Sequence, residues 1–356
     1  MSQLFTPITL RDVTVRNRVW VAPMCQYSAV DGMPDDWHLV HLGSFARGGA
    51  GLVITEATAV VPEGRISPED TGLWNDEQQA AWARIVDFVH GQGAAAGIQL
   101  AHAGRKASTY SGFTAARGGV ADADGGWRPV GPSETPYPGL REDPEPLDAA
   151  GIAHVVTAFG DAAERAVAAG FDVLEVHAAH GYLLHEFLSP LSNHRTDGYG
   201  GGFEGRVRLT LEVVRELRAR VAPGVPVVVR LSATDWVEGG WTADETVRLA
   251  GLLREEGVDL VDTSTGGNAP ADIPVGPGYQ VPFARRVRTE AGIRSGAVGL
   301  ITEPKQAEDV LADGSADVVL LARELLRDPH WPLRAAAELG VEGTDLWPVQ
   351  YRRAAR

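Results

Sequence analysis

The chain has 356 residues, 44% of them hydrophobic, and a formal net charge of −15 at pH 7. The negative charge argues against nucleic acid and anionic membranes as partners, and no apolar stretch is long enough to span a membrane. The single cysteine, Cys25, excludes an intrachain disulfide and a cysteine-ligated zinc or iron–sulfur site within one chain, and it fits a reducing compartment, so we expect a cytoplasmic protein.

Short apolar runs alternate with longer amphipathic segments from one end of the chain to the other. Strands are predicted at residues 18–22, 51–55, 97–100, 173–177, 225–231, 260–263, 295–299 and 318–321. Helices are predicted at residues 77–90, 152–169, 204–220, 243–256 and 304–313. Eight buried strands that alternate with helices favour an α/β fold, a closed parallel TIM (β/α)8 barrel, over an open doubly wound sheet. We therefore expect residues 1–356 to form a single barrel domain.

One segment breaks the alternation. Residues 109–146 are rich in Gly, Pro, Asp and Ser and show no sustained periodicity. A loop of this length inside a compact domain is usually an active-site lid or a disordered insertion. Because it follows the third predicted strand, we expect a lid loop on the catalytic face of the barrel.

Reactive residues follow the predicted strands at the end where barrel active sites lie. In chain order they are Pro23, Met24, Cys25 and Tyr27, then Glu56 and Ala57, then Gln99, His102, Arg105 and Lys106, then His177, His180 and Tyr182, then Arg230, Ser264, Gly299, Ala322 and Arg323. This clustering predicts an active site at the carboxyl ends of the strands.

The fourth predicted strand ends in His177, His180 and Tyr182. Two imidazoles and a phenol can bind a carbonyl oxygen and deliver a proton, which favours activation of a conjugated carbonyl. As a metal site the two histidines lack a third ligand in the same pattern, so we predict no metal. Two unrelated core histidines are the remaining alternative.

The last two strands end where barrels commonly bind phosphate. Gly299 allows close approach of the backbone, and Arg323 can form paired hydrogen bonds with a phosphate.

Four other residues have two possible interpretations each. Arg230 fits either a structural ion pair or a buried anionic cofactor. Arg105 and Lys106 could equally be solvated loop charges, and Cys25 an inert core residue.

The sequence Gly200-x-Gly202-x-x-Gly205 matches the dinucleotide-binding fingerprint but follows a polar run instead of a strand. The structural context of that motif is therefore missing. We expect any nicotinamide cofactor to bind without a Rossmann domain.

Five segments carry a resemblance to a known family. They are APMCQYSA (22–29), GGAGLVITEATAV (48–60), IQLAHAGRK (98–106), HAAHGYLLHEFLSPLSNHRTDGYGG (177–201) and ARELLRDP (322–329). In this order they resemble the old yellow enzymes, FMN-dependent ene-reductases built on a TIM barrel. The match is best with the cysteine-containing, thermophilic-like branch that includes xenobiotic reductases. The chain departs from the family pattern at Ala322, where glycine is usual.

The resemblance implies tightly but non-covalently bound FMN across the barrel mouth. Its implied contacts are Gln99 and Arg230 at the pyrimidine edge, Pro23, Met24 and Ala57 at the ring, Cys25 near N5, and Ser264, Gly299, Ala322 and Arg323 at the phosphate. A positive charge from Arg230 beside the flavin would favour the anionic reduced form.

The same resemblance implies a reaction in two halves, with NADPH or NADH as the reductant. His177 and His180 would donate to the oxygen of an activated alkene (enone, enal, maleimide or nitroalkene), and Tyr182 would protonate the α-carbon. Tyr27 would position the substrate. The choice between NADPH and NADH stays open, although the basic lid residues Arg117, Arg128 and Arg141 weakly favour NADPH.

The carboxyl-terminal segment 345–356 is implied to reach a neighbouring subunit, where Arg353 would enter the active site of a homodimer or homotetramer. Trp347 or Tyr351 would then pack at that interface. Two other functions remain as alternatives. One is a different FMN barrel oxidoreductase, such as a 2-hydroxy-acid oxidase or a dihydroorotate dehydrogenase, and the other is a non-catalytic flavin-binding redox sensor.

Overall fold

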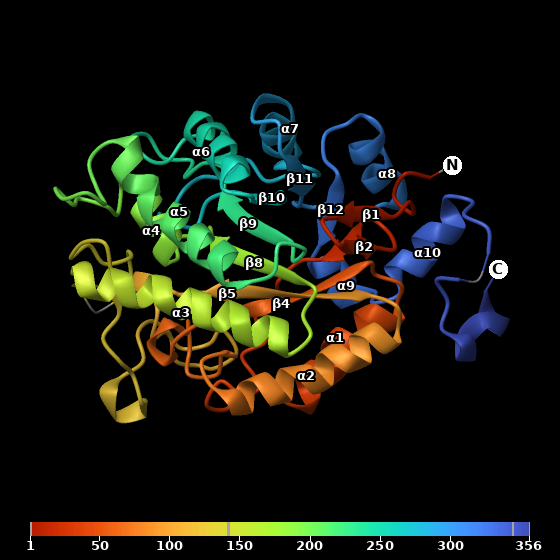
Figure 1. The fold of residues 1–356 in the computed structure, drawn as a ribbon, viewed down its shortest axis with the longest axis horizontal. Helices are drawn as coiled ribbons and strands as arrows, with labels where there is room; N and C mark the ends of the chain where they lie inside the picture. Colours follow the sequence, from red (N-terminus) through yellow and green to blue (C-terminus); the bar gives the residue numbers. More distant parts are fainter. Residues whose placement is uncertain (1, 141–142, 344, 356) are drawn as a thin grey trace.

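The structure is a computed structural model that describes residues 2–140, 143–343 and 345–355. Its centre is a closed barrel in which eight strands pair in the order β10-β11-β12-β3-β4-β5-β8-β9 (Figure 1). The barrel strands are β3 (Val19–Val21), β4 (Leu52–Ala59), β5 (Ala95–Ala101), β8 (Val173–Ala178), β9 (Val227–Ser232), β10 (Leu260–Ser264), β11 (Arg294–Ala297) and β12 (Val318–Leu321). Every neighbouring pair is parallel. The predicted TIM barrel is confirmed, and each predicted strand overlaps one barrel strand.

Helices surround the barrel. They are α1 (Asp36–Arg47), α2 (Asp76–Gly91), α3 (Ala149–Ala168), α4 (Leu183–Leu188), α5 (Phe203–Arg220), α6 (Ala243–Glu255), α7 (Val281–Glu290), α8 (Pro304–Ala312), α9 (Arg323–Arg327) and α10 (Trp331–Glu338). The five predicted helices correspond to α2, α3, α5, α6 and α8. Polar N-cap residues precede α2, α3 and α6. The side chains of Asn75, Asp148 and Thr242 each accept a backbone N–H of the first helical turn.

The sequence analysis did not predict α1 and α7. Helix α1 buries His38 and Gly43 together with its apolar residues, and α7 buries only Ala284 and Val287. The buried face of each helix carries few large apolar side chains, so the apolar pattern that marks a helix in the sequence is short. Tertiary packing therefore decides these two helices.

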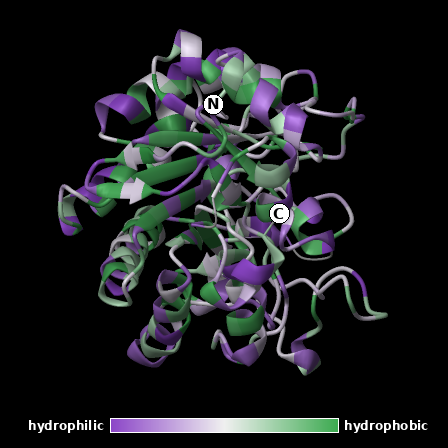
Figure 2. Cartoon of the chain, turned by 90° about the vertical axis from the view of Figure 1, so that its right-hand side faces the viewer, coloured by the Kyte–Doolittle hydropathy of each residue, from purple (hydrophilic) through white to green (hydrophobic). Residues whose placement is uncertain are grey.

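Alternation along the strands divides the barrel interior into an apolar and a polar part. In β8, Val173 belongs to the interior apolar cluster, whereas Leu174 and Val176 pack in the larger cluster that includes the surrounding helices. Glu175 and His177, two and four residues after Val173, therefore face inward. Strands β9 and β10 repeat this pattern with Arg230 and Asp262. Figure 2 shows the largely hydrophobic strands at the centre of the molecule.

A hairpin that the sequence analysis missed precedes the barrel. Strands β1 (Ile8–Leu10) and β2 (Val13–Val15) pair antiparallel. Leu10 and Val15 are buried in the same cluster as Val173 and Leu260, which begin their strands. The hairpin therefore packs on the amino-terminal end of the barrel and leaves the carboxyl end for the candidate site.

Two segments outside the barrel carry further predictions. The loop of residues 109–146 contains the short helix η3 (Asp122–Asp124) and the strands β6 (Val130–Gly131) and β7 (Glu145–Pro146). The carboxyl-terminal turn η4 (Val349–Ala354) lies near α10 (Figure 1), and Tyr351 there stacks obliquely against His330. The structure describes a single copy of the chain, so the contribution of residues 345–356 to a neighbouring subunit stays a prediction.

No helix within the described ranges has both the length and the apolar character needed to cross a bilayer. The same ranges hold no group of three or more His, Cys, Asp or Glu side chains arranged to bind a metal ion.

Candidate active site

Residues from separate parts of the chain meet at the carboxyl end of the barrel. Cys25, Tyr27 and Tyr182 are half-buried against one small cluster, formed by Ala57, Ile66, Ala101, Ala103 and Ala107. Cys25 and Tyr27 follow β3, whereas Tyr182 follows β8. The structure therefore brings together the thiol and the two phenols that the sequence singled out.

Burial controls the protonation of these three groups. It raises the pKa of the Cys25 thiol well above its usual value, and the carboxyl groups of Asp70 and Glu56 reinforce the shift. It also raises the pKa of Tyr182 well above 10 and that of Tyr27 in the same direction. At neutral pH, Cys25 is therefore a thiol and both tyrosines are neutral phenols.

His177 is buried and has one available ring nitrogen. Its Nδ1 accepts the backbone N–H of Ala179 at 3.3 Å. Burial lowers the pKa of His177 well below 6.5, and the charges of Arg230 and Lys106 add to the effect. The neutral ring must then carry its proton on Nε2, which makes that nitrogen a hydrogen-bond donor.

His180 stands perpendicular to His177, with ring centroids 5.2 Å apart. Burial and the charge of Arg230 also lower the pKa of His180 well below 6.5. Its Nε2 lies 2.8 Å from Ser264 Oγ, which was predicted only as a phosphate contact. Nδ1 can carry the proton of the neutral ring if the Ser264 hydroxyl donates to Nε2.

Lys106 proves to be part of the site and not a solvated loop charge. Its Nζ donates to the backbone oxygens of His180 at 2.7 Å and Gly267 at 3.1 Å. The ammonium also lies over two aromatic rings, 4.9 Å from the centre of Tyr182 and 4.7 Å from that of Tyr137. Burial lowers the pKa of Lys106 to about 8. Arg105 is also buried, and it donates to the backbone oxygen of Asn268 at 2.6 Å.

Below these residues the barrel interior holds a charged group. Arg230 Nε lies 2.9 Å from Asp262 Oδ2 on the neighbouring strand, and both side chains are almost fully buried. Gln99 Nε2 donates to Glu175 Oε1 at 2.7 Å. The acidic partner that a structural ion pair requires is therefore present. Apart from this ion pair through Nε, Arg230 has no side-chain polar partner within the described residues, so its two terminal NH2 groups can bind an additional anion.

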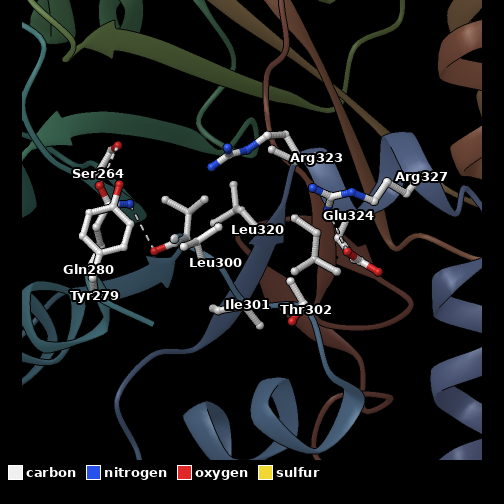
Figure 3. A pocket seen from close by; sticks show the side chains of 14 residues that line it. Ser264, Tyr279, Gln280, Leu300, Ile301, Thr302, Leu320, Arg323, Glu324 and Arg327 are labelled. Carbon is white, nitrogen blue, oxygen red and sulfur yellow. Dashed lines mark hydrogen bonds and ion pairs between the residues drawn. The ribbon is translucent and has the colours of Figure 1, made fainter. Parts of the chain in front are cut away.

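The predicted phosphate residues line a single cavity of about 170 Å³ (Figure 3). Ser264, Gly299, Ala322 and Arg323 all contribute to its wall. Gly299 has φ +120°, and a Cβ there would lie 3.1 Å from the Tyr279 ring, so a side chain would be strained and crowded. Within the described residues no carboxylate pairs with Arg323, although Glu324 pairs with Arg327 at 3.0 Å. An unpaired guanidinium beside a close backbone approach fits a phosphate group.

The remaining backbone positions predicted to contact the flavin are in and next to strands β3 and β4. Pro23 and Met24 are half-buried just after β3, and Ala57 is buried in β4 at a shift of the β4–β5 register. Their contact with a flavin stays a prediction.

The loop of residues 109–146 contributes aromatic side chains that the sequence analysis did not select. Phe113 makes an edge contact with Tyr27 at 5.5 Å between ring centres. Trp127 packs against the same cluster as Cys25, and Tyr137 lies beside Lys106. The aromatic residues within this loop were the sequence signal that could have identified them as contacts of the candidate site. The role of the loop as a lid stays a prediction.

The basic residues suggested for NADPH have local partners. Arg128 lies 3.4 Å from Glu145, and Arg117 donates to the backbone oxygens of Thr114 and Ala116. Arg141 lies outside the described residues. Arg353 is exposed on η4, and no hydrogen bond or ion pair joins it to the residues above in the described part of the chain.

We expect Asp70→Asn to reduce the pH dependence of folding stability. Burial, with a smaller contribution from Glu56, raises the pKa of Asp70 from 3.8 to about 8, so the folded state holds a proton that the unfolded state releases. The stabilisation is complete below pH 3.8 and is lost as pH rises through 8, at up to about 1.4 kcal/mol per pH unit for one proton.

Urea denaturation at pH 5, 7 and 9 measures this effect. The free energy of unfolding of the unmodified protein should fall relative to that of Asp70→Asn as pH rises. Glu63→Gln, at an exposed position, should leave the slope unchanged. Parallel pH profiles for the Asp70 variant and the unmodified protein would contradict a protonated Asp70.

Comparison with known proteins gives three strong similarities. A family model described as "NADH:flavin oxidoreductase / NADH oxidase family" matches residues 3–342. The chain is 47% identical over 356 residues to an NADPH dehydrogenase of Listeria innocua, and the match covers 99% of both proteins. The structure of morphinone reductase in complex with tetrahydroNAD is similar with a TM-score of 0.80 and 28% identity, over 98% of this chain and 95% of that one.

A second solved structure, 2-naphthoyl-CoA reductase in complex with 2-naphthoyl-CoA, matches with a TM-score of 0.86 and 26% identity. The match covers 94% of this chain and 52% of that protein, so this chain spans about half of its length.

Proposed function

The chain belongs to the NADH:flavin oxidoreductase / NADH oxidase family, and from this premise we propose that it is an NADPH-dependent ene-reductase with FMN at the barrel mouth. The observation that carries the proposal is the donor set at the carboxyl end of β8. His177 has a proton on Nε2, and the neutral phenol of Tyr182 lies 5.0 Å from it between ring centres. An oxygen-binding donor and a proton donor are thus adjacent.

The residues around the barrel mouth fit FMN. Ser264, Gly299, Ala322 and Arg323 would hold its phosphate, and Gln99 and Arg230 its pyrimidine edge. Pro23, Met24, Ala57 and Cys25 would border the ring. When bound, the flavin would supply the hydride that it receives from NADPH or NADH to the β-carbon of the alkene.

Each donor would act on a different atom of the substrate. His177 Nε2–H would hold the carbonyl or nitro oxygen, on which negative charge develops as the β-carbon receives hydride. Tyr182 would give its proton to the α-carbon. Because burial raises the pKa of Tyr182, the phenol keeps its proton until the carbon becomes basic. His180 would donate to the same oxygen through Nδ1, with the Ser264 hydroxyl donating to Nε2.

Other residues would shape the site. Tyr27 and the loop of residues 109–146 would enclose the substrate, with Phe113 packed on Tyr27. The Cys25 thiol would lie near the flavin N5 and influence its reduction potential without a covalent intermediate, since its raised pKa disfavours the thiolate. Arg353 would complete the site of a neighbouring subunit in a homodimer or homotetramer.

The alternative of a different FMN barrel oxidase requires a general base. Nδ1 of His177 already accepts the Ala179 N–H, and its Nε2 carries the proton. The ring is therefore arranged for donation and not for proton abstraction, which favours reduction of an activated alkene. A redox sensor would have no need for the adjacent proton donor Tyr182.

Anaerobic stopped-flow absorbance tests the proposal. NADPH should bleach the bound flavin, and 2-cyclohexenone added afterwards should restore its absorbance rapidly. Bleaching without recovery would exclude ene reduction and turn the search to other electron acceptors. A protein that purifies without flavin and fails to bind FMN would contradict the cofactor assignment.

A further inference from the structure

The turn that presents His180 and Tyr182 has an unfavourable backbone conformation. His180 has φ +60° and Gly181 has φ +72°, so two consecutive residues are left-handed. A left-handed non-glycine residue is destabilising by about 1–3 kcal/mol and persists only when its surroundings enforce it. A Cβ on Gly181 would lie 2.2 Å from the Gly267 backbone oxygen, so the turn is closely packed on one side.

Three side chains from different elements hold the polar backbone groups of this turn. Ser232 Oγ accepts the His180 N–H at 2.9 Å, and Lys106 Nζ donates to the His180 oxygen at 2.7 Å. His185 Nδ1 accepts the Gly181 N–H at 2.9 Å. Ser232 is the last residue of β9, and Lys106 lies in the short helix Gly104–Lys106 that follows β5. His185 lies in α4, directly after the turn.

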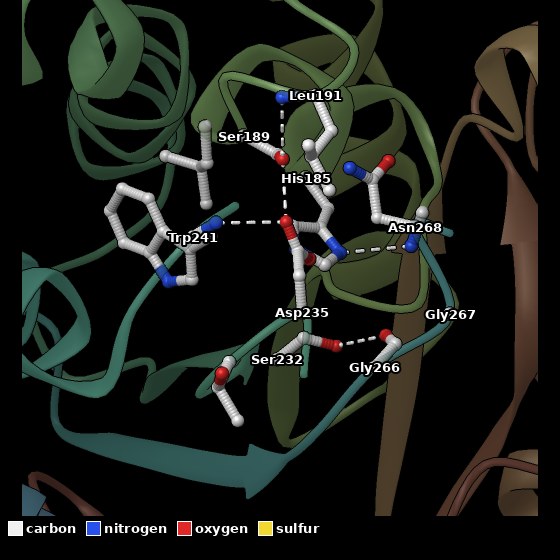
Figure 4. A network of polar contacts seen from close by, with 12 residues as sticks. His185, Ser189, Leu191, Ser232, Asp235, Trp241, Gly266, Gly267 and Asn268 are labelled. Carbon is white, nitrogen blue, oxygen red and sulfur yellow. Dashed lines mark hydrogen bonds and ion pairs between the residues drawn. The ribbon is translucent and has the colours of Figure 1, made fainter. Parts of the chain in front are cut away.

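His185 is completely buried beside a buried carboxylate. Its Nε2 lies 2.9 Å from Asp235 Oδ1, and both side chains are fully inaccessible to solvent (Figure 4). Because Nδ1 accepts the Gly181 N–H, the ring proton lies on Nε2, facing Asp235. The other tautomer would place two N–H groups against each other and leave the carboxylate without a donor from the ring.

Asp235 is itself held in place. Its Oδ2 accepts the Ser189 hydroxyl at 2.5 Å and the Trp241 backbone N–H at 2.9 Å (Figure 4). Neither His185 nor Asp235 lines the cavity of Figure 3 or joins the cluster around Cys25. The pair is therefore behind the site and not within it.

We propose that His185 and Asp235 are positioning residues for the proton-transfer step. His185 Nδ1 holds the Gly181 N–H and thereby sets the direction of Tyr182 and His180, while Asp235 keeps Nδ1 an acceptor by holding the ring proton on Nε2. The inference rests on the proposed role of Tyr182 as proton donor. Small displacements of a reacting group can reduce rates about 10²-fold, so the hydrogen bond has kinetic consequences beyond stability.

Two substitutions separate the two contacts of His185. The amide of His185→Asn matches the position of Nδ1, so its oxygen can still accept the Gly181 N–H but nothing reaches Asp235. The amide of His185→Gln matches Nε2 and can donate to Asp235, but leaves the Gly181 N–H unpaired. We expect reoxidation of the reduced flavin by 2-cyclohexenone to slow about 10- to 100-fold in His185→Gln and less in His185→Asn.

A second measurement on the same holoenzymes reports the turn directly. Hydrogen–deuterium exchange of the Gly181 amide should accelerate in His185→Gln and remain slow in His185→Asn. Flavin reduction by NADPH should change little in either variant. Thr210→Ala is the matched control for a general loss of stability, because Thr210 is buried in α5 and its hydroxyl has no hydrogen-bond partner within the described residues.

The outcomes distinguish this inference from the proposed function. If the unmodified protein shows no reoxidation by the enone, the proposed function fails before the variants are compared. If it does, and both His185 variants lose rate equally, or Thr210→Ala slows reoxidation as much as His185→Gln, the pair is only structural. Fast Gly181 exchange in the unmodified protein would also overturn the inference.

Discussion

Tyr182→Phe is expected to slow the reoxidation of reduced flavin by an enone by about 10²–10⁴-fold, while reduction of the flavin by NADPH changes little. The substitution removes only the hydroxyl. The ring keeps its edge contact with His177 and its position under the Lys106 ammonium. Only the step that needs a proton at the α-carbon should therefore respond. Single-turnover stopped-flow absorbance measures the two halves separately.

The pH dependence gives a second test of the same residue. Burial raises the pKa of Tyr182 well above 10, so the phenol stays protonated across the neutral range. The reoxidation rate of the unmodified protein should not fall through deprotonation of this residue between about pH 6 and 9.

Tyr27→Phe is the control for the Tyr182→Phe substitution, because it removes a neighbouring phenol that is not assigned the proton transfer. Equal slowing of both halves in Tyr182→Phe would assign the residue to binding and not to proton donation.

Arg230→Gln should have the largest effect on the whole protein. Asp262 would lose the cation 2.9 Å away, and Glu175 would lose a nearby positive charge that favours its ionised form. Removing one partner of a buried ion pair is destabilising by about 3–5 kcal/mol. The variant should also bind FMN more weakly and shift the flavin reduction potential to a more negative value, because the anionic reduced form loses its countercharge. Urea denaturation, flavin-fluorescence titration and spectroelectrochemistry measure these changes.

The double variant Arg230→Gln/Asp262→Asn separates the structural ion pair from cofactor binding. Replacing both partners removes the uncompensated buried charge, so much of the lost stability should return. FMN affinity and reduction potential should stay at the values of the single variant, since the cation is still absent. If the double variant recovers both flavin properties, Arg230 acts only as a structural partner of Asp262.

The barrel could be predicted because its strands are encoded locally. Short β-branched runs such as VPVVVRL at residues 225–231 are buried on both faces, and amphipathic segments separate them. The hairpin β1–β2 was missed because its strands have only three residues each. Their apolar side chains are buried by packing against the end of the barrel, which no local pattern indicates. The predicted phosphate cavity followed from barrel geometry, since the ends of β11 and β12 are neighbours in the closed sheet.

Much of the site could also be found along the chain. His177, His180 and Tyr182 lie within six residues of one another. Arg230, Ser264 and Gly299 were selected because they lie at the ends of predicted strands. Their local spacing is enough because parallel strands place their carboxyl ends on the same face. Cys25 and Tyr27 were identified by the same rule, and their protonation states required the folded environment.

The barrel and the reactive side chains at its mouth could therefore be predicted from the chain, because apolar strand runs and strand-end positions are local properties of the sequence. The folded structure was needed to show that Asp262 faces Arg230, that Lys106 contacts the His180 turn, and that His185 is paired with Asp235. Burial and long-range contacts set the charge and tautomer of each group. These quantities depend on neighbours that lie far away in the sequence, and no local pattern specifies them.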